Sequence, residues 1–162
     1  MTEIKSVSVD LSTFEGNIEF HNVWFRYPTR KTDWVLKGLN LKINRNETVA
    51  LVGESGCGKS TIVSLILRFY DVNHGKITID GIDIKDYNLK QLRHAMSLVM
   101  QEPTLFNYSI LENILYGEVN ATNSEVLKSA HIANALEFIA SQDAINSIER
   151  DDTPQGLINQ ML

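Results

Sequence analysis

The chain has 162 residues, 43% of them hydrophobic and 22% charged, which is typical of one ordinary globular domain. The single cysteine excludes an intramolecular disulfide, and the net charge of −5 argues against a broad nucleic-acid-binding surface. No apolar run approaches the roughly 18 residues that a membrane span requires, and the first residues carry no signal-peptide core. Composition thus argues against membrane-spanning, secreted, disordered and disulfide-framework proteins, but it names no function.

The first half of the chain predicts mostly strands. Residues 1–16 are polar and without period, and we expect a tail or linker there. Alternating apolar residues predict strands near 17–27 and 35–43. The short β-branched run at 48–52 predicts a strand that is buried on both faces, as in a parallel sheet.

A helix is expected after the glycine-rich stretch 53–58, because apolar residues recur there at i, i+3, i+4 and i+7. These residues are Ile62, Leu65, Ile66 and Phe69. Further on, Asp80-Gly81 lies between two alternating runs and predicts a hairpin over 76–84. A short helix over 89–95 and an apolar strand over 97–100 complete this part of the chain.

Helices dominate the expected structure beyond Met100. Ser109 with Glu112, and Thr122 with Glu125, have capping-box spacing ahead of apolar periodicity. We therefore expect helices at about 109–115 and 122–141. Residues 141–162 are polar, contain a proline and a glycine, and predict a divergent tail.

One motif carries specific chemistry. Residues 53–60 read Gly-Glu-Ser-Gly-Cys-Gly-Lys-Ser and match the phosphate-binding pattern G-x-x-x-x-G-K-[ST] between a predicted strand and a predicted helix. Glycines let the backbone curl around phosphate oxygens, and the N–H groups that open a helix favour negative charge. Lys59 would contact the β and γ phosphates, and the Ser60 hydroxyl would bind Mg²⁺. Cys57 is interpreted as a small residue that fits the loop; the alternative is a thiol with enhanced thiolate character, because it lies at a helix N-terminus beside Lys59.

The loop alone does not decide between several classes of protein: GTPases, nucleotide kinases, helicases and transport ATPases. The sequence lacks the N-K-x-D and D-x-x-G strings of a GTPase. Three segments flank the loop in a particular order: Phe25 to Arg30, Val35 to Leu39, and Leu98 to Phe106, the last including Gln101-Glu102-Pro103. In this order the chain resembles the nucleotide-binding domain of an ABC exporter of the multidrug-resistance or peptide-transporter type, from about Asn17 to Ile139.

The resemblance implies a role for individual positions. Tyr27 corresponds to the aromatic residue that stacks on adenine, and Gln101 to the glutamine that contributes to catalysis, contacts Mg²⁺ and senses the γ-phosphate. Arg30 and Val35 correspond to positions that line the nucleotide. The full set of nucleotide-binding residues that the resemblance implies is Tyr27, Arg30, Val35, Gly53, Glu54, Ser55, Gly56, Cys57, Gly58, Lys59, Ser60 and Thr61, with Ser60 and Gln101 as Mg²⁺ ligands.

The resemblance also implies features that the 162 residues lack: a Leu-Ser-Gly-Gly-Gln signature, an apolar strand ending in Asp-Glu, and a later switch histidine. The expected fold is therefore α/β, a partial P-loop ATPase domain over 17–140 with an antiparallel β layer, a truncated parallel core and a helical segment. The expected function is the ATP-binding part of an exporter motor. The alternative is a catalytically inactive nucleotide-binding or self-associating fragment.

The partners that the resemblance implies are ATP or ADP with Mg²⁺, the transmembrane domains of a parent transporter, and a second nucleotide-binding domain. The expected location is the cytoplasmic side of a membrane, with the isolated chain soluble. Because buried strands would lack neighbours, we also expect a homo-oligomer or a domain swap of this chain. No nucleic-acid partner is expected.

Overall fold

The computed structural model describes residues 7–8 and 13–141 and divides the chain into two units, residues 1–98 and 99–162. Most of the predicted tail 141–162, and much of the predicted linker 1–16, lie outside the described residues. Among the residues that are described, no helix combines the length and the apolar character that a membrane span needs.

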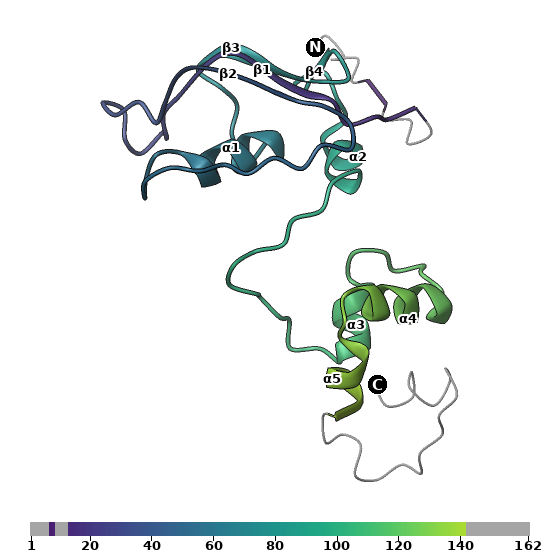
Figure 1. Ribbon diagram of the computed structural model, residues 1–162. Helices are drawn as coiled ribbons and strands as arrows, with labels where there is room; N and C mark the ends of the chain where they lie inside the picture. The colour runs from purple at the N-terminus through teal and green to yellow at the C-terminus, as the bar shows by residue number, and fades with distance from the viewer. Residues whose placement is uncertain (1–6, 9–12, 142–162) are drawn as a thin grey trace, which may run out of the picture. The chain divides into compact units, whose positions relative to one another are not determined.

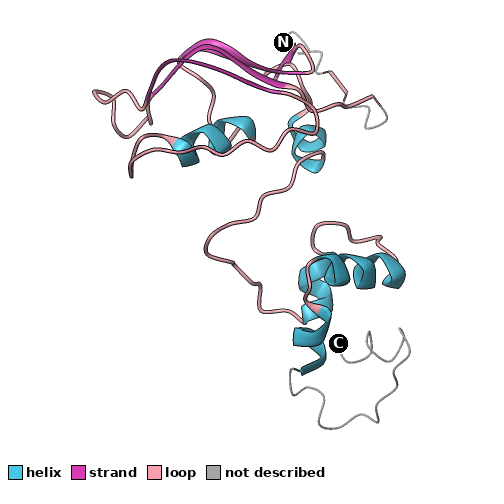
Figure 2. Ribbon diagram, viewed as in Figure 1, coloured by secondary structure: helices cyan, strands magenta, loops and turns pink. Residues whose placement is uncertain are grey.

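The first unit contains a four-stranded antiparallel sheet in the order β2-β1-β3-β4 (Figures 1 and 2). Its strands are β1 (Ile18–Phe25), β2 (Leu36–Ile43), β3 (His74–Ile79) and β4 (Ile82–Asp83). Both predicted N-terminal strands and the predicted hairpin are confirmed. Asp80 and Gly81 form the two-residue hairpin turn with φ values of 50° and 81°, as a turn with two left-handed residues requires.

Two helices lie on one side of this sheet, α1 (Lys59–Ile66) and α2 (Leu89–His94) (Figure 1). The sheet curves over α1, which presents the buried side chains of Thr61, Ile62 and Leu65. Apolar residues of both layers form one core. Its buried members are Phe20, Val23, Phe25, Leu36, Ile62, Leu65, Val72, Ile77, Ile79, Ile84, Tyr87 and Leu92.

The predicted strands at 48–52 and 97–100 are wrong, and no parallel core forms among the described residues. Both segments are apolar, yet neither pairs with a neighbouring strand. A strand is stabilised by hydrogen bonds to its neighbour, so an apolar β-branched run without one remains irregular. As a consequence, Val52 is 91% exposed and Val99 is 96% exposed.

The helix after the phosphate-loop motif is shorter than its apolar period suggests. It ends at Ile66, and Arg68 adopts a left-handed conformation with φ of 50°. The amide of Phe69 then donates to the carbonyl of Ser64 at 2.9 Å, which closes the helix end. Phe69, expected on the apolar helix face, consequently lies beyond the helix and is about half exposed.

The Asp80 carboxylate fastens the segment before β1 to the β3–β4 turn. It accepts backbone N–H bonds from Glu15, Gly16 and Asn17 at 2.8–3.1 Å. Partial burial raises the pKa of Asp80, but these three bonds and one from the Asn17 side chain together outweigh that effect, and its pKa lies below the usual value. The end of the predicted linker is therefore tied to the sheet.

This clamp predicts a pH dependence of stability. A carboxylate whose pKa is lowered on folding stabilises the fold above its unfolded pKa of about 3.9, and the contribution is lost as pH falls through the folded value. Asp80→Asn keeps a residue that tolerates the left-handed conformation but removes the charge. We expect the variant to melt at a lower temperature than the parent at pH 7 and the difference to shrink below about pH 4. Thermal melts from pH 7 to 2.5 measure it; a pH-independent difference would contradict the clamp.

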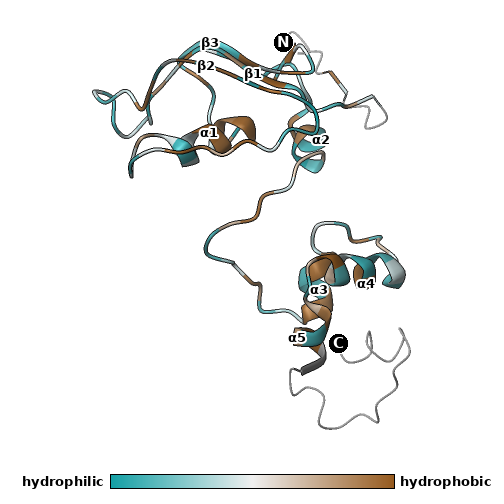
Figure 3. Cartoon of the chain, in the orientation of Figure 1, coloured by the Kyte–Doolittle hydropathy of each residue, from teal (hydrophilic) through white to brown (hydrophobic). Residues whose placement is uncertain are grey.

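The second unit is helical, with α3 (Ile110–Leu115), α4 (Asn123–Ile132) and α5 (Leu136–Ser141). Both predicted capping boxes are confirmed, at Ser109 and Thr122. The largely apolar α3 (Figure 3) contributes Leu111 to a small core that also contains Val126, Ala130 and Ile139.

The single helix predicted over 122–141 is wrong, because the chain breaks after α4. Asn134 adopts φ of 55°, and its amide donates to the His131 carbonyl at 2.9 Å. The Ala135 amide donates to the Ala130 carbonyl at 2.8 Å. This pair of bonds is a Schellman helix end, which asparagine supports because it tolerates the left-handed conformation.

Candidate functional site

The phosphate-loop motif, residues 53–60, leads directly into α1. Gly58 caps the helix in a left-handed conformation, with φ of 100° and no side-chain cap. A Cβ atom at Gly58 would lie 3.0 Å from Leu36 Cδ2 and 3.2 Å from Val35 Cγ1. The position thus needs glycine both for its backbone angle and for its close approach to the start of β2. The first N–H groups of α1 have no partner within the helix, so they are free to bind an anion.

Lys59 opens α1 and folds back over the loop. Its ammonium donates to the carbonyls of Gly53 at 2.7 Å and Glu54 at 2.6 Å, and it lies 3.5 Å from Cys57 Sγ. A flexible side chain with three donors can exchange such carbonyls for phosphate oxygens at little cost. The lysine is therefore held over the loop, where a bound phosphate would meet it.

Tyr27 is brought to α1 by a hydrogen bond. Its hydroxyl lies 2.9 Å from the Thr61 hydroxyl, and Thr61 is only 2% exposed. A buried hydroxyl without a partner costs about 1–3 kcal/mol, so this bond ties the tyrosine to the third residue of the helix. The expected aromatic residue and the phosphate-loop motif consequently lie in one unit, joined through α1.

The other residues expected at the nucleotide site do not all lie beside the phosphate loop. Val35 lies against Gly58, beside the loop. The Arg30 amide donates to the Tyr27 carbonyl at 2.9 Å and closes the turn after β1, with the arginine side chain exposed. Gln101 is exposed and belongs to the second unit, so its predicted roles in binding Mg²⁺ and sensing phosphate remain predictions.

One residue next to the site was missed by sequence reasoning. Tyr70 packs against Tyr27 with ring centroids 5.2 Å apart and against Phe25 at 5.7 Å. The apolar period of α1 predicts that Phe69, not Tyr70, packs against the core. The left-handed turn at Arg68 changes this, and no glycine at that position signals the turn in the sequence. The signal that could have found this residue is the aromatic pair Phe69-Tyr70, three and four residues beyond the end of α1.

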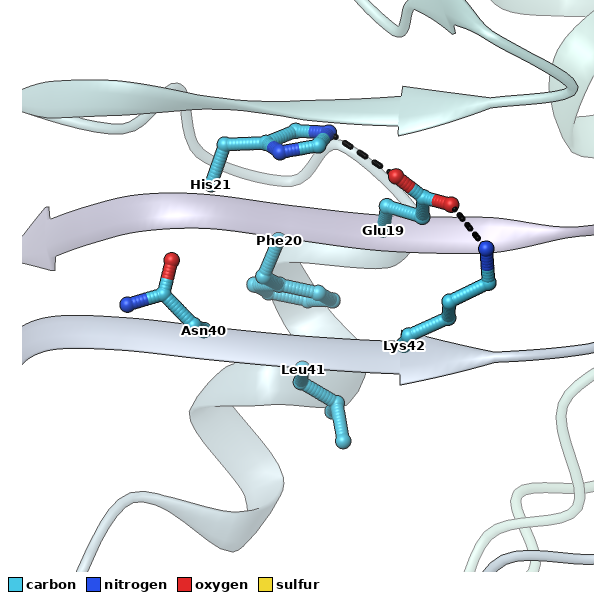
Figure 4. Close-up of a pocket in the computed structure, with 6 residues that line it drawn as sticks. All are labelled: Glu19, Phe20, His21, Asn40, Leu41 and Lys42. Carbon is cyan, nitrogen blue, oxygen red and sulfur yellow. Dashed lines mark ion pairs between the residues drawn. The ribbon is translucent and has the colours of Figure 1, made fainter.

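A different surface feature lies over β1 and β2. An open depression of about 340 Å³ there is lined by Glu19, Phe20, His21, Asn40, Leu41 and Lys42. Figure 4 shows Phe20 and Leu41 extending to one side of the sheet and Glu19 and His21 to the other. Glu19 pairs with Lys42 at 2.7 Å and with His21 at 3.3 Å. The hydrogen bond from Lys42, helped by its charge, lowers the pKa of Glu19. These ion pairs satisfy the depression's own charges, and it does not belong to the phosphate-loop site.

Comparison with known protein families decides the family. Residues 36–155, more than half of the chain, match the family described as ABC transporter. The chain belongs to the ABC transporter family. The match extends beyond Ile139, the residue at which the sequence pattern was expected to leave the family.

Individual relatives agree with this assignment. The chain is 53% identical over 125 residues to multidrug resistance protein pgp-1 of Caenorhabditis elegans, covering 77% of this chain and 10% of that protein. It is 48% identical over 147 residues to ABC transporter B family member 21 of Arabidopsis thaliana, covering 91% and 10%. It is 51% identical over 131 residues to ABC transporter B family member 4 of Dictyostelium discoideum, covering 81% and 17%.

The chain spans about a tenth to a sixth of the length of these relatives. It is an ABC transporter ATP-binding domain, homologous to B-family ABC transporters, which confirms the expected P-loop ATPase fold class and the expected function as an ATP-binding domain of this family. The comparisons favour this function over the alternative of an inactive fragment.

Proposed function

We propose that residues 17–98 form an ATP-binding surface in which Tyr27 stacks on adenine and the 53–60 loop with α1 holds the phosphates. The observation that supports it best is the 2.9 Å bond between Tyr27 and Thr61. It links an aromatic ring to the first turn of the helix whose N-terminus would face the phosphates. In this proposal, base and phosphate would be bound at the two ends of one short connection.

The residues of the first unit fit a phosphate-bound Mg²⁺ ion. The Ser60 hydroxyl lies in the first turn of α1, where it would supply an oxygen ligand, and the backbone around Gly56 is open, since a Cβ there would meet nothing within 4 Å. When bound, Mg²⁺ neutralises charge on the β and γ phosphate oxygens. Ser60 would orient the ion, Lys59 would neutralise the phosphates beside it, and Gln101 is the proposed further ligand.

We further propose that this domain serves an exporter as a motor, coupling ATP binding and hydrolysis to transport at the cytoplasmic side of a membrane. The similar proteins include a multidrug resistance protein and B-family ABC transporters. The proposed partners are the transmembrane domains of such a transporter and a second nucleotide-binding domain.

The ATP site is tested by removing the proposed adenine platform. We expect Tyr27→Ala to weaken Mg-ATP binding by roughly 5- to 100-fold, since base stacking on an aromatic is worth about 1–3 kcal/mol. Binding of inorganic tripolyphosphate, which has no base, should change much less. Calorimetric titration of the full chain with both ligands measures the two affinities.

Trp24→Ala is the matched control, because Trp24 is an aromatic residue of β1, three positions before Tyr27, and its indole N–H donates to Asn22 at 3.2 Å. It should leave ATP affinity near that of the parent. Equal losses for Tyr27→Ala and Trp24→Ala, or an unchanged ATP affinity in Tyr27→Ala, would reject the adenine platform.

The exposed apolar segments 48–52 and 97–100 support a proposal that copies of this chain associate. Val52 and Val99 are almost fully exposed, and unpaired apolar segments recruit other chains. We expect sedimentation velocity to show a mass that rises with concentration across about 1–100 µM, a range typical of weak complexes. Val99→Lys should reduce this association. Val119→Lys, at another exposed valine, should not, and a concentration-independent monomer would contradict the proposal.

A further inference from the structure

We propose that Tyr70 is a positioning residue of the nucleotide site: its ring holds Tyr27 in the orientation that stacks on adenine. This inference deepens the proposed function and rests on it. The phosphate-loop motif does not point to it, since Tyr70 is four residues beyond the end of α1 and outside the 53–60 loop.

Three contacts converge on the Tyr27 side chain. Its hydroxyl bonds Thr61, and its ring meets the Phe25 ring at 5.1 Å and the Tyr70 ring at 5.2 Å, with interplanar angles of 79° and 89°. Edge-to-face pairs of this kind are favourable and directional. Tyr27 is therefore fixed at its tip by one bond and at its ring by two aromatic neighbours.

The backbone on either side of Tyr70 is anchored. Before it, the Arg93 guanidinium of α2 donates to the carbonyls of Leu67 at 3.1 Å and Arg68 at 2.9 Å. After it, the Asn73 amide donates to the Trp24 carbonyl at 3.0 Å, and the Asn73 side chain accepts from the Arg26 amide at 2.9 Å. Tyr70 is thus held between two fixed points, opposite the end of β1 that precedes Tyr27.

Phe25 and Tyr70 differ in how deeply they are buried, which indicates different roles. Phe25 is 2% exposed and belongs to the core, whereas Tyr70 is 39% exposed and is not a member of it. Removing the Phe25 ring would disturb the whole unit. Removing the Tyr70 ring mainly lets the Tyr27 ring move. Binding of a base must then overcome the entropy that is lost when the Tyr27 ring becomes ordered.

The inference predicts a selective effect on adenine nucleotides. Tyr70→Leu, which keeps apolar volume and removes the ring, should weaken Mg-ATP binding by roughly three- to tenfold and leave tripolyphosphate binding unchanged. Tyr70→Phe should restore ATP affinity, because the contact is made by the ring. Thermal melts of both variants should lie close to the parent, in keeping with the exposure of Tyr70.

A double-mutant cycle with Tyr27 provides the decisive readout. If Tyr70 acts through Tyr27, then Tyr70→Leu should have no further effect on ATP affinity in a Tyr27→Leu background. Calorimetry on the four full-length proteins gives the coupling. An undiminished effect of Tyr70→Leu in that background, or an equal loss of tripolyphosphate binding, would show a merely structural role and overturn the inference.

Failure of the proposed function has a different signature. If the parent chain binds neither ATP nor tripolyphosphate, the site itself is rejected and the role of Tyr70 falls with it. If the parent binds ATP and Tyr27→Leu weakens it while Tyr70→Leu changes nothing, only the positioning role is overturned.

Discussion

Lys59→Ala is expected to weaken the binding of both Mg-ATP and tripolyphosphate by roughly 10- to 100-fold, because a hydrogen bond to a charged group is worth about 1.5–3 kcal/mol. The ammonium lies over the loop, 2.6 Å and 2.7 Å from the carbonyls of Glu54 and Gly53. It would turn from these carbonyls to phosphate oxygens. Since it contacts phosphate and no base, its loss should not distinguish the two ligands, in contrast to the loss of the Tyr27 ring.

Lys37→Ala is the matched control for this prediction. Lys37 is an exposed lysine of β2 in the same unit, so its substitution removes the same charge without touching the loop. Ligand titrations of both variants at two salt concentrations distinguish a direct contact with phosphate from the long-range effect of removing a positive charge. Salt strongly screens the long-range effect of an exposed charge. Unchanged affinities in Lys59→Ala, or equal losses in Lys37→Ala, would remove the 53–60 loop from the phosphate site.

Local sequence signals predicted much of this chain because the deciding interactions are themselves local. The capping boxes at Ser109 and Thr122 need only a residue three positions away, and the Asp80-Gly81 turn needs only its own backbone angles. The glycines of the phosphate-loop motif belong to the same class. In each case a few neighbouring residues determine the conformation, so the printed sequence is sufficient.

The wrong expectations concern interactions between distant segments. The runs at 48–52 and 97–100 are largely apolar, and the first is also rich in β-branched residues, but a strand needs a hydrogen-bonded neighbour as well, which composition does not reveal. Left-handed turns without glycine, at Arg68 and Asn134, ended two helices earlier than their apolar periods indicated. The first of these turns also directs Tyr70 toward Tyr27, which is why the candidate site contains a residue that the sequence did not predict.

Gly75→Ala should be among the most destabilising single-methyl additions in the first unit. Between the pairs His21–Lys76 and Trp24–His74, β1 has two residues where β3 has only Gly75, which is a β-bulge. Gly75 adopts φ of 79°, and a Cβ atom there would lie 2.3 Å from the Asn22 carbonyl oxygen and 2.4 Å from that of His21. Both obstacles are backbone atoms, so the strands themselves must separate.

Gly81→Ala isolates the conformational part of this cost. Gly81 has nearly the same angle, φ of 81°, but its Cβ would meet nothing within 4 Å. We expect this control to lose about 1–2 kcal/mol from the left-handed strain alone, and Gly75→Ala to lose about 3 kcal/mol or more because the clash adds to it. Urea unfolding of the two variants and the parent gives the free energies. Equal losses of unfolding free energy would mean that the bulge relaxes freely. A larger loss for Gly75→Ala shows that the bulge fixes how β1 approaches β3. It would then also fix the end of β1 that carries Phe25 toward Tyr27.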